Sequence, residues 1–218
     1  MSRKGLILFI ACGIAWGLPY AFIAIALEEF DVATIVLARC LIGVAVLLPF
    51  AIYRKAIMPA LKHWRWVLVF ALLEMVGPWF LITNAERTIS SGLTGLLIAI
   101  VPFWGVFIAY YFLGDKSVKH PKTIFGLVIG FVGVLLLVGV DALTANLDLI
   151  GVGSVILASI GYAIAPAVSS RTIGHLDSAG VIALSMVFVS IIYAVPGFSA
   201  LPASLPNATF DGWMALIV

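Results

Sequence analysis

The stretch AERTISSGLTGLLIAIVPFWGVFIAYYFLGD, residues 85–115, decides the fold class of this chain. No charged side chain occurs from Ser91 to Leu113, and a helix of this length, at about 1.5 Å per residue, crosses a hydrocarbon core of about 30 Å. Pro102, near its middle, cannot donate a backbone hydrogen bond. Within a bilayer such a break is tolerated where protein or a water-lined cavity receives the freed carbonyl. The stretch therefore predicts a broken membrane helix beside a cavity.

The composition indicates that lipid is the solvent. Hydrophobic residues make up 64% of the 218 residues and charged residues 10%, with a mean hydropathy of +1.23, whereas soluble domains have about 25% charged residues. No basic cluster resembles a nucleic-acid footprint. Cys12 and Cys40 lie in apolar runs without a CxxC spacing, which predicts packing roles rather than a metal site or a disulfide.

Apolar runs predict seven full membrane spans and the start of an eighth. The connecting segments are too short to form a separate domain, so the expected fold is an all-α polytopic helical bundle. The spans are Gly5–Leu27, Thr34–Tyr53, Trp66–Thr83, Ser91–Leu113, Thr123–Val140, Gly151–Val168 and Gly180–Ala194, and the eighth begins at Trp213.

Loop charges predict the orientation. If every span crosses, all loop lysines and arginines except Arg87 fall on one side, and seven acidic residues collect with Arg87 on the other. The positive-inside rule then places the amino terminus in the cytoplasm of a multi-pass inner-membrane protein. The basic residues are Arg3, Lys4, Arg54, Lys55, Lys62, Arg65, Lys116, Lys119, Lys122 and Arg171, and the acidic ones are Glu28, Glu29, Asp31, Glu86, Asp141, Asp148 and Asp211.

A weak internal repeat occurs at an offset of 146 residues, pairing for example Asp31 with Asp177 and Gly5 with Gly151. It maps the first span on the sixth and the second on the seventh. Five spans per repeat is an odd number, so the second copy is expected to be inverted in the membrane. The expected units are residues 1–146 and a truncated second repeat, 147–218, which lacks a counterpart of about 80 residues. We therefore expect the chain to be a fragment of a ten-span protein.

Five segments of the chain form a pattern through their order and spacing. They are AWG at 15–17, LARCLIG at 37–43, NAERTISSGLTGLLIAIVPFWGVFIAYYFLGD at 84–115, GLVIGFVGVLLLVG at 126–139 and, more loosely, SIGYAIAPAVSSR at 159–171. In this order the segments resemble the EamA-type transporters of the drug/metabolite transporter superfamily. Two departures from the family pattern are Asp115, where a glutamate is usual, and Ala85-Glu86, where a small Ala-Leu pair is usual. The resemblance implies ten helices in two inverted halves, a central path, and transport of small metabolites.

Trp16, Glu74, Pro102 and Tyr162 are expected near the bilayer midplane, about 12–17 Å from an end of their spans. An ionisable group at that depth costs on the order of several kcal/mol unless it faces water or a partner. Glu74 is therefore expected to contact a cationic or amine group of a substrate, or to bind a coupling proton. The structural alternative is a neutral carboxyl bonded to a neighbouring helix.

Arg39 and a set of aromatic residues complete the candidate site. Arg39 can snorkel to the outer interface, reach toward Glu74 or stack on Trp79, so anchoring and contact with a substrate carboxylate both remain open. The aromatic residues are expected to wall a cavity for amphipathic solutes, with packing or lipid contact as the alternative. They are Trp16, Tyr20, Trp79 and Trp104.

These observations predict a secondary transporter that exports small amino-acid-like or amphipathic metabolites by alternating access around a midplane cavity. The expected partners are the lipid bilayer and a small-molecule substrate, without nucleic acid, and the oligomeric state stays open. The sequence has no phosphate-binding glycine loop, metal cluster or nucleophile-base pair, so we expect no cofactor, no metal and no catalysis. A non-transporting scaffold or an inactive fragment is the alternative.

Overall fold

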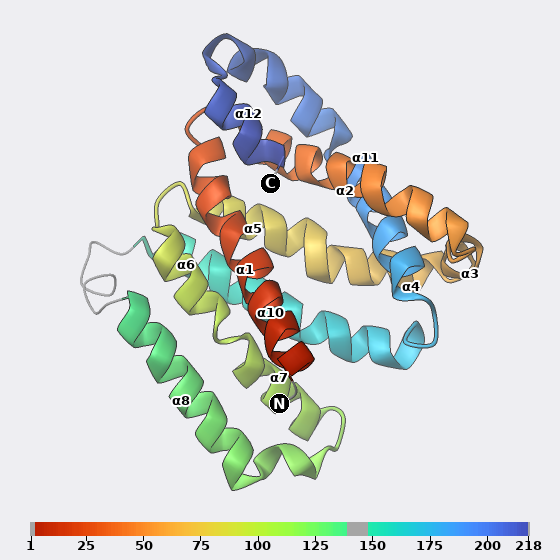
Figure 1. Ribbon diagram of the computed structural model, residues 1–218, viewed down its shortest axis with the longest axis vertical. Coiled ribbons are helices and arrows are strands. Elements are labelled where there is room, and N and C mark those ends of the chain that lie inside the picture. The colour runs from red at the N-terminus through yellow and green to blue at the C-terminus, as the bar shows by residue number, and fades with distance from the viewer. Residues whose placement is uncertain (1–2, 139–147, 218) are drawn as a thin grey trace.

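Helices build the whole described architecture (Figure 1). The computed structural model describes residues 3–138 and 148–217, is 85% helical, and has no strand in those residues. The helices are α1 (Arg3–Ala26), α2 (Val32–Tyr53), α3 (Ile57–Lys62), α4 (Trp64–Ala71), α5 (Gly77–Ala85), α6 (Ser91–Ile98), α7 (Val101–Tyr111), α8 (Pro121–Val138), α10 (Leu149–Thr172), α11 (Ser178–Ser204) and α12 (Phe210–Ile217), with a π-helix η1 (Leu72–Val76) and 3-10 helices η2 (Lys116–Lys119) and η3 (Leu205–Asn207). Asp141 and the expected boundary between residues 146 and 147 lie outside the described residues.

Short polar side chains start the long helices. The Asp31 carboxylate accepts a hydrogen bond from the Ala33 amide at 3.0 Å, and Asp177 accepts one from the Ala179 amide at 2.9 Å. Asp148 caps α10 in the same way. Such caps satisfy amides that the helix itself leaves unpaired, so each apolar helix begins at the residue that follows a charged turn.

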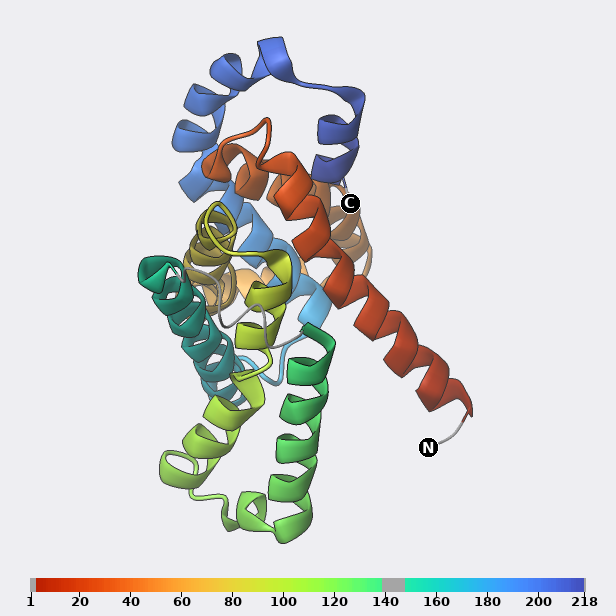
Figure 2. The ribbon, with the colours of Figure 1, turned by 90° about the vertical axis from the view of Figure 1, so that its left-hand side faces the viewer.

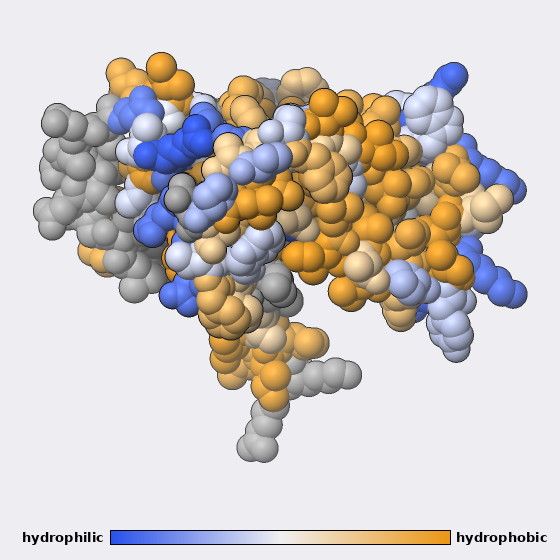
Figure 3. Space-filling view, turned by 90° about the horizontal axis from the view of Figure 1, so that it is seen from above, coloured by the Kyte–Doolittle hydropathy of each residue, from blue (hydrophilic) through white to orange (hydrophobic). Residues whose placement is uncertain are grey.

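Five helical segments are long and apolar enough to cross a membrane. They are Val32–Tyr53, Trp64–Ala85, Ser91–Tyr111, Leu149–Thr172 and Ser178–Ser204. Within α1 and α8 the described apolar stretches, Gly17–Ala26 and Pro121–Gly133, are shorter, so the seven crossings stay a prediction. Figure 3 shows hydrophilic residues gathered toward two opposite sides of the visible face, with a hydrophobic zone between them. This distribution supports a multi-pass integral membrane protein.

The break expected near Pro102 is confirmed. Helix α6 ends at Ile98 and α7 begins at Val101, so the interruption lies just before the proline. The expected end of the seventh span at Ala194 is wrong, because α11 continues to Ser204. Pro196 lies inside α11, and α2 contacts the backbone at the next residue: the Thr34 hydroxyl donates to the Gly197 carbonyl at 2.9 Å.

Loops that alternate along the chain meet at the same end of the bundle. At one end Arg87 pairs with Asp31 at 3.1 Å, and the Thr88 hydroxyl donates to Asp148 at 2.6 Å. At the opposite end Arg54 pairs with Asp177 at 2.7 Å. The rings of His63 and His175 also meet at that opposite end, with centroids 5.2 Å apart, although the sequence offered no reason to pair them.

Helix boundaries recur 146 residues apart. The ends of α1 and α10 follow this spacing, as do the starts of α2 and α11 and of α4 and α12. Contacts are exchanged in the same manner: α1 and α2 pack on α12, whereas α10 and α11 pack on α4. Helices α2 and α11 pack together and run antiparallel, since Thr34 contacts Gly197 while Gly180 lies against Ala56. A two-fold axis that lies in the membrane plane would relate the helices in this way.

The α7 and α8 pair extends away from the other helices, and the amino-terminal half of α1 extends away on another side (Figure 2). Helix α7 has no buried residue. Beside it lies an open apolar groove lined by Ile100, Phe103, Trp104, Phe107 and Phe131. The cavity that contains polar groups lies instead between α1, α2, α10 and the segment formed by η1 and α5.

Candidate functional site

The third membrane-spanning segment changes its helical hydrogen bonding where Glu74 lies. Residues Leu72–Val76 form a π-helix, closed by a bond from the Gly77 amide to the Leu72 carbonyl. Pro78 follows at the start of α5 and has no amide hydrogen, so the Glu74 carbonyl lacks its ordinary helical donor. Such π-bulges occur frequently at functional sites. The local sequence thus leaves a carboxyl and a backbone acceptor at one turn.

A glycine lets α10 approach this turn closely. A Cβ built on Gly161 would lie 2.7 Å from the Leu73 carbonyl oxygen and 3.2 Å from the Pro78 side chain. Only a residue without a side chain fits at these distances, and the close approach brings the next residue, Tyr162, to the cavity. On the other flank, the Tyr193 hydroxyl donates to the Val76 carbonyl at 2.9 Å. The π-helix is therefore held by α10 and α11 together.

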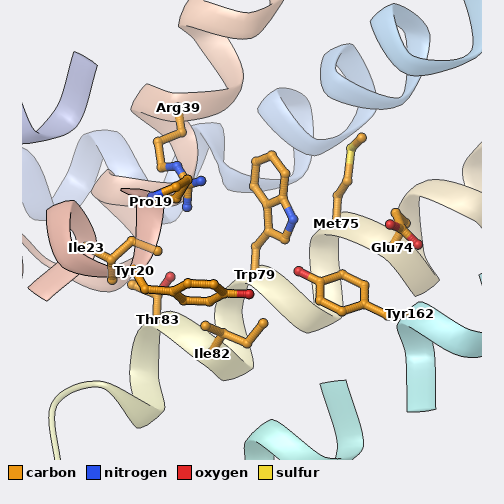
Figure 4. Close-up of a pocket in the computed structure, with 10 residues that line it drawn as sticks. All are labelled: Pro19, Tyr20, Ile23, Arg39, Glu74, Met75, Trp79, Ile82, Thr83 and Tyr162. Carbon is orange, nitrogen blue, oxygen red and sulfur yellow. The ribbon is translucent and has the colours of Figure 1, made fainter. Parts of the chain in front are cut away.

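The cavity has a volume of about 380 Å³ and lies between four elements of the bundle (Figure 4). Arg39 reaches it from α2, and the phenol oxygens of Tyr20 and Tyr162 point toward one another from α1 and α10. Trp79 stands between Arg39 and Glu74. The lining residues are Pro19, Tyr20, Ile23, Arg39, Glu74, Met75, Trp79, Ile82, Thr83 and Tyr162.

Arg39 stacks on an aromatic ring instead of pairing with a carboxylate. Its guanidinium carbon lies 4.9 Å from the centroid of the Trp79 ring, which confirms one of the arrangements expected from the sequence. The ion pairs among the described residues are Arg54–Asp177 and Arg87–Asp31, both outside the cavity. A cation–π contact of this kind contributes on the order of 1 kcal/mol, and it leaves guanidinium donors available to a ligand.

Two polar groups of the cavity are buried without a hydrogen-bond partner among the described residues. They are the Glu74 Oε2 atom and the Thr83 hydroxyl. Native proteins rarely leave buried polar atoms unsatisfied, and such atoms are explained by water, an ion or a functional role. The cavity therefore offers an acceptor at Glu74 and a hydroxyl at Thr83 on one face of α5 and its π-helix.

Five of the seven site residues proposed from the sequence line this one cavity. They are Tyr20, Arg39, Glu74, Trp79 and Tyr162. Pro102 is exposed at the start of α7 and does not line it. Trp16 belongs to α1, but its side chain lies outside the described residues, as does that of Cys12. Trp104, also expected in the aromatic wall, lines the apolar groove instead and donates to the Ser159 hydroxyl at 3.0 Å.

Sequence reasoning missed the remaining lining residues. Thr83 follows Trp79 by one helical turn, and Ile23 follows Tyr20 by about one turn, so helical spacing from the named candidates would have found both. Met75 is adjacent to Glu74 and carries no signal of its own.

The apolar helices define a multi-pass integral membrane protein, and the cavity between them contains polar groups. The sequence model of the EamA-like transporter family matches residues 3–139, and the chain belongs to that family. Its members are transporters and not enzymes. Among curated proteins, none matches the chain.

Proposed function

We propose that this protein is a secondary transporter of zwitterionic, amino-acid-like solutes, which bind in the cavity between α1, α2, α5 and α10. The observation that carries the proposal is the unpaired arrangement of Arg39 and Glu74 on either side of Trp79. A solute with an ammonium and a carboxylate group would satisfy both charged side chains at once. Charge-assisted bonds of this type are stronger than neutral ones.

Aromatic walls suit the apolar part of such a solute. Tyr20, Trp79 and Tyr162 surround the space between the two charged residues. A cavity of about 380 Å³ is within the ordinary range for small-ligand sites, roughly 300–1,000 Å³. Size and lining therefore favour a single small metabolite over a macromolecular ligand.

The mechanism we propose is alternating access between two inverted repeats, residues 1–146 and 147–218. The recurrence of helix boundaries 146 residues apart and the exchanged contacts of α4 and α12 support this arrangement. A cavity beside the axis between the repeats can face either side as one repeat rocks against the other. The clustering of loop lysines and arginines on one side supports a cytoplasmic amino terminus. We propose the cytoplasmic membrane as the location and export as the direction of transport.

The test is solute flux in proteoliposomes that contain the full 218-residue chain. A panel of neutral amino acids is compared in wild type, E74Q and E28Q, the last being a matched control because Glu28 is exposed at the end of α1. We expect E74Q to lower flux at least about tenfold, equivalent to about 1.4 kcal/mol, and E28Q to leave it unchanged. Equal flux in all three proteins would show that Glu74 is not part of the substrate site and would contradict the proposed site. Absence of flux for every solute in folded wild type would favour the alternative of a non-transporting scaffold or an inactive fragment.

A further inference from the structure

A second buried carboxyl lies outside the substrate cavity. Glu86 ends α5, and both of its carboxyl oxygens are buried without a hydrogen-bond partner in the part of the chain that the structure describes. Its acidic neighbours at this end behave differently. Asp31 pairs with Arg87, Asp148 accepts from Thr88, and Glu29 accepts from Thr209. Glu86 therefore differs from these acidic residues, because its carboxyl oxygens are buried and no described residue donates a hydrogen bond to them.

Glu86 lies at the outer edge of the proposed path. It follows Thr83 by three residues, about 4.5 Å of helical rise, and Thr83 lines the cavity with an unpartnered hydroxyl. Arg39, on the facing helix α2, lines the same cavity and acts electrostatically on Glu86. Opening this end of the path would bring water first to Glu86 and then to Thr83.

The surroundings of Glu86 favour its neutral form. Burial raises the pKa of Glu86 from 4.5 to about 8, while Thr94 on α6 and Arg39 on α2 oppose the rise without cancelling it. The Thr94 hydroxyl itself donates to the Ser90 carbonyl at 3.2 Å. Arg87, the cation next to Glu86 in the sequence, is paired with Asp31, and the acidic groups Asp148 and Glu29 at this end accept hydrogen bonds from threonines. An ionised carboxylate buried in this place would have no adequate partner.

We propose that Glu86 is a proton-binding site separate from the substrate cavity, and that closing the outer end of the path over it takes up one proton. The proposal rests on the proposed transport function, since it requires an end that opens. The neutral carboxyl is compatible with burial, whereas the carboxylate draws Glu86 toward water. Closure is therefore linked to proton uptake in the same way as any binding equilibrium.

The direction of the linkage follows from the two pKa values. Below the ordinary value of 4.5 both the closed and the open state carry the proton, so pH has no effect on closure. Between 4.5 and about 8 the closed state alone keeps it, and closure becomes less favourable as pH rises. Above about 8 the closed state must bury a charge, and the open state is favoured most.

The test measures access to the cavity instead of transport. Thr83→Cys, introduced after Cys12 and Cys40 are replaced by alanine, places a thiol one turn from Glu86. The full chain in nanodiscs is labelled with a membrane-impermeant thiol reagent from about pH 5 to about pH 9, in proteins that carry Glu86, E86Q or the control E28Q. Because the same thiol is used throughout, its own ionisation cancels in the comparison.

We expect labelling of the protein with Glu86 and of E28Q to exceed that of E86Q at least about fivefold at the alkaline end, and all three to agree at the acid end. Profiles that coincide at every pH would overturn the proposal. If E86Q fails to fold, infrared spectroscopy of wild type reads the protonated carboxyl directly. In wild type, the carbonyl band of a neutral carboxylic acid should be present near pH 6 and lost above about pH 8. The band should persist at pH 6 in E74Q. If the band is lost only in E74Q, the proton is bound by Glu74 instead of Glu86. Thiol labelling and infrared spectra do not depend on solute flux. A protein without flux would therefore contradict the transport proposal, while the labelling and the spectra would still test the role of Glu86.

Discussion

Arg39 is held at the cavity by an aromatic ring of a neighbouring helix. The guanidinium lies 4.9 Å from the Trp79 ring centroid, on a half-buried part of α2. A planar guanidinium stacks on an indole and keeps its in-plane donors free, whereas a lysine ammonium has no plane to stack. The pairing with Trp79 therefore orients the donors of Arg39 toward the cavity.

We predict that R39K weakens recognition of the substrate carboxylate. The KM for a zwitterionic amino acid should rise about tenfold, equivalent to about 1.4 kcal/mol, while the KM for the corresponding amine without a carboxylate should change little. The measurement is proteoliposome flux with both solutes at equal membrane abundance. Arg65→Lys is the control, since Arg65 lies 5.6 Å from the Trp64 ring but is exposed outside the cavity. Equal losses for both solutes would assign Arg39 a structural role.

At the scale of elements, the interrupted helix Trp64–Ala85 positions the site. A regular α-helix would satisfy its own backbone and leave little reason for α10 to approach. The π-helix Leu72–Val76 instead presents the Leu73 carbonyl to Gly161 and the Val76 carbonyl to Tyr193. The contact between these elements brings Tyr162 and Glu74 to the same cavity.

We predict that G161A destabilises the protein by about 1–3 kcal/mol. The added methyl would lie 2.7 Å from the Leu73 carbonyl oxygen, so α10 must shift away from the π-helix and carry Tyr162 with it. The matched control is G153A in the same helix, where an added methyl meets nothing within 4 Å. Alanine is favoured over glycine in helices, so G153A should be neutral or stabilising. Thermal unfolding in one detergent compares the two, and equal melting temperatures would contradict the close approach.

At the scale of the whole molecule, an ion pair at one end of the bundle and a hydrogen bond at the other join the two predicted repeats. Arg54 and Asp177 meet at one end, while Thr88 and Asp148 meet at the other. Hydrogen bonds from the Ala179 amide and then from Arg54 hold the pKa of Asp177 below its ordinary range. Exposed ion pairs such as Arg54–Asp177 contribute only about 0–1 kcal/mol each to stability. Contacts this weak are compatible with the proposed mechanism, in which each end of the bundle opens and closes.

We predict that the end with Arg54 faces the cytoplasm. In a protein without Cys12 and Cys40, a cysteine at Lys62 should react with an impermeant reagent only after the cells are opened. A cysteine at Glu28, at the end of the bundle that holds Asp31 and Arg87, should react in intact cells. The reverse pattern would invert the orientation, and reaction of both from one side would rule out the alternation of the loops.

Local patterns were enough to locate most of the helices and several of the site residues. The run from Ser91, the break before Pro102 and the end of α2 at Tyr53 all follow from hydropathy and from the chemistry of proline. Hydropathy could not place the end of α11, because Pro196 looks like a stop signal until α2 is seen beside it. Nor could it separate Trp79 from Trp104, since both are tryptophans in apolar helices and only one faces the polar cavity.

The sequence by itself determined that the chain is a helical membrane protein of the EamA-like family, because hydropathy, proline position and motif order are local properties. Tertiary structure alone decided that Arg39 stacks on Trp79 and stays apart from Glu74, and that Glu86 is buried without a partner. These are relations between side chains of different helices. They depend on how α1, α2, α5 and α10 pack, and packing is set by close contacts such as Gly161 on Leu73, which no single helix encodes.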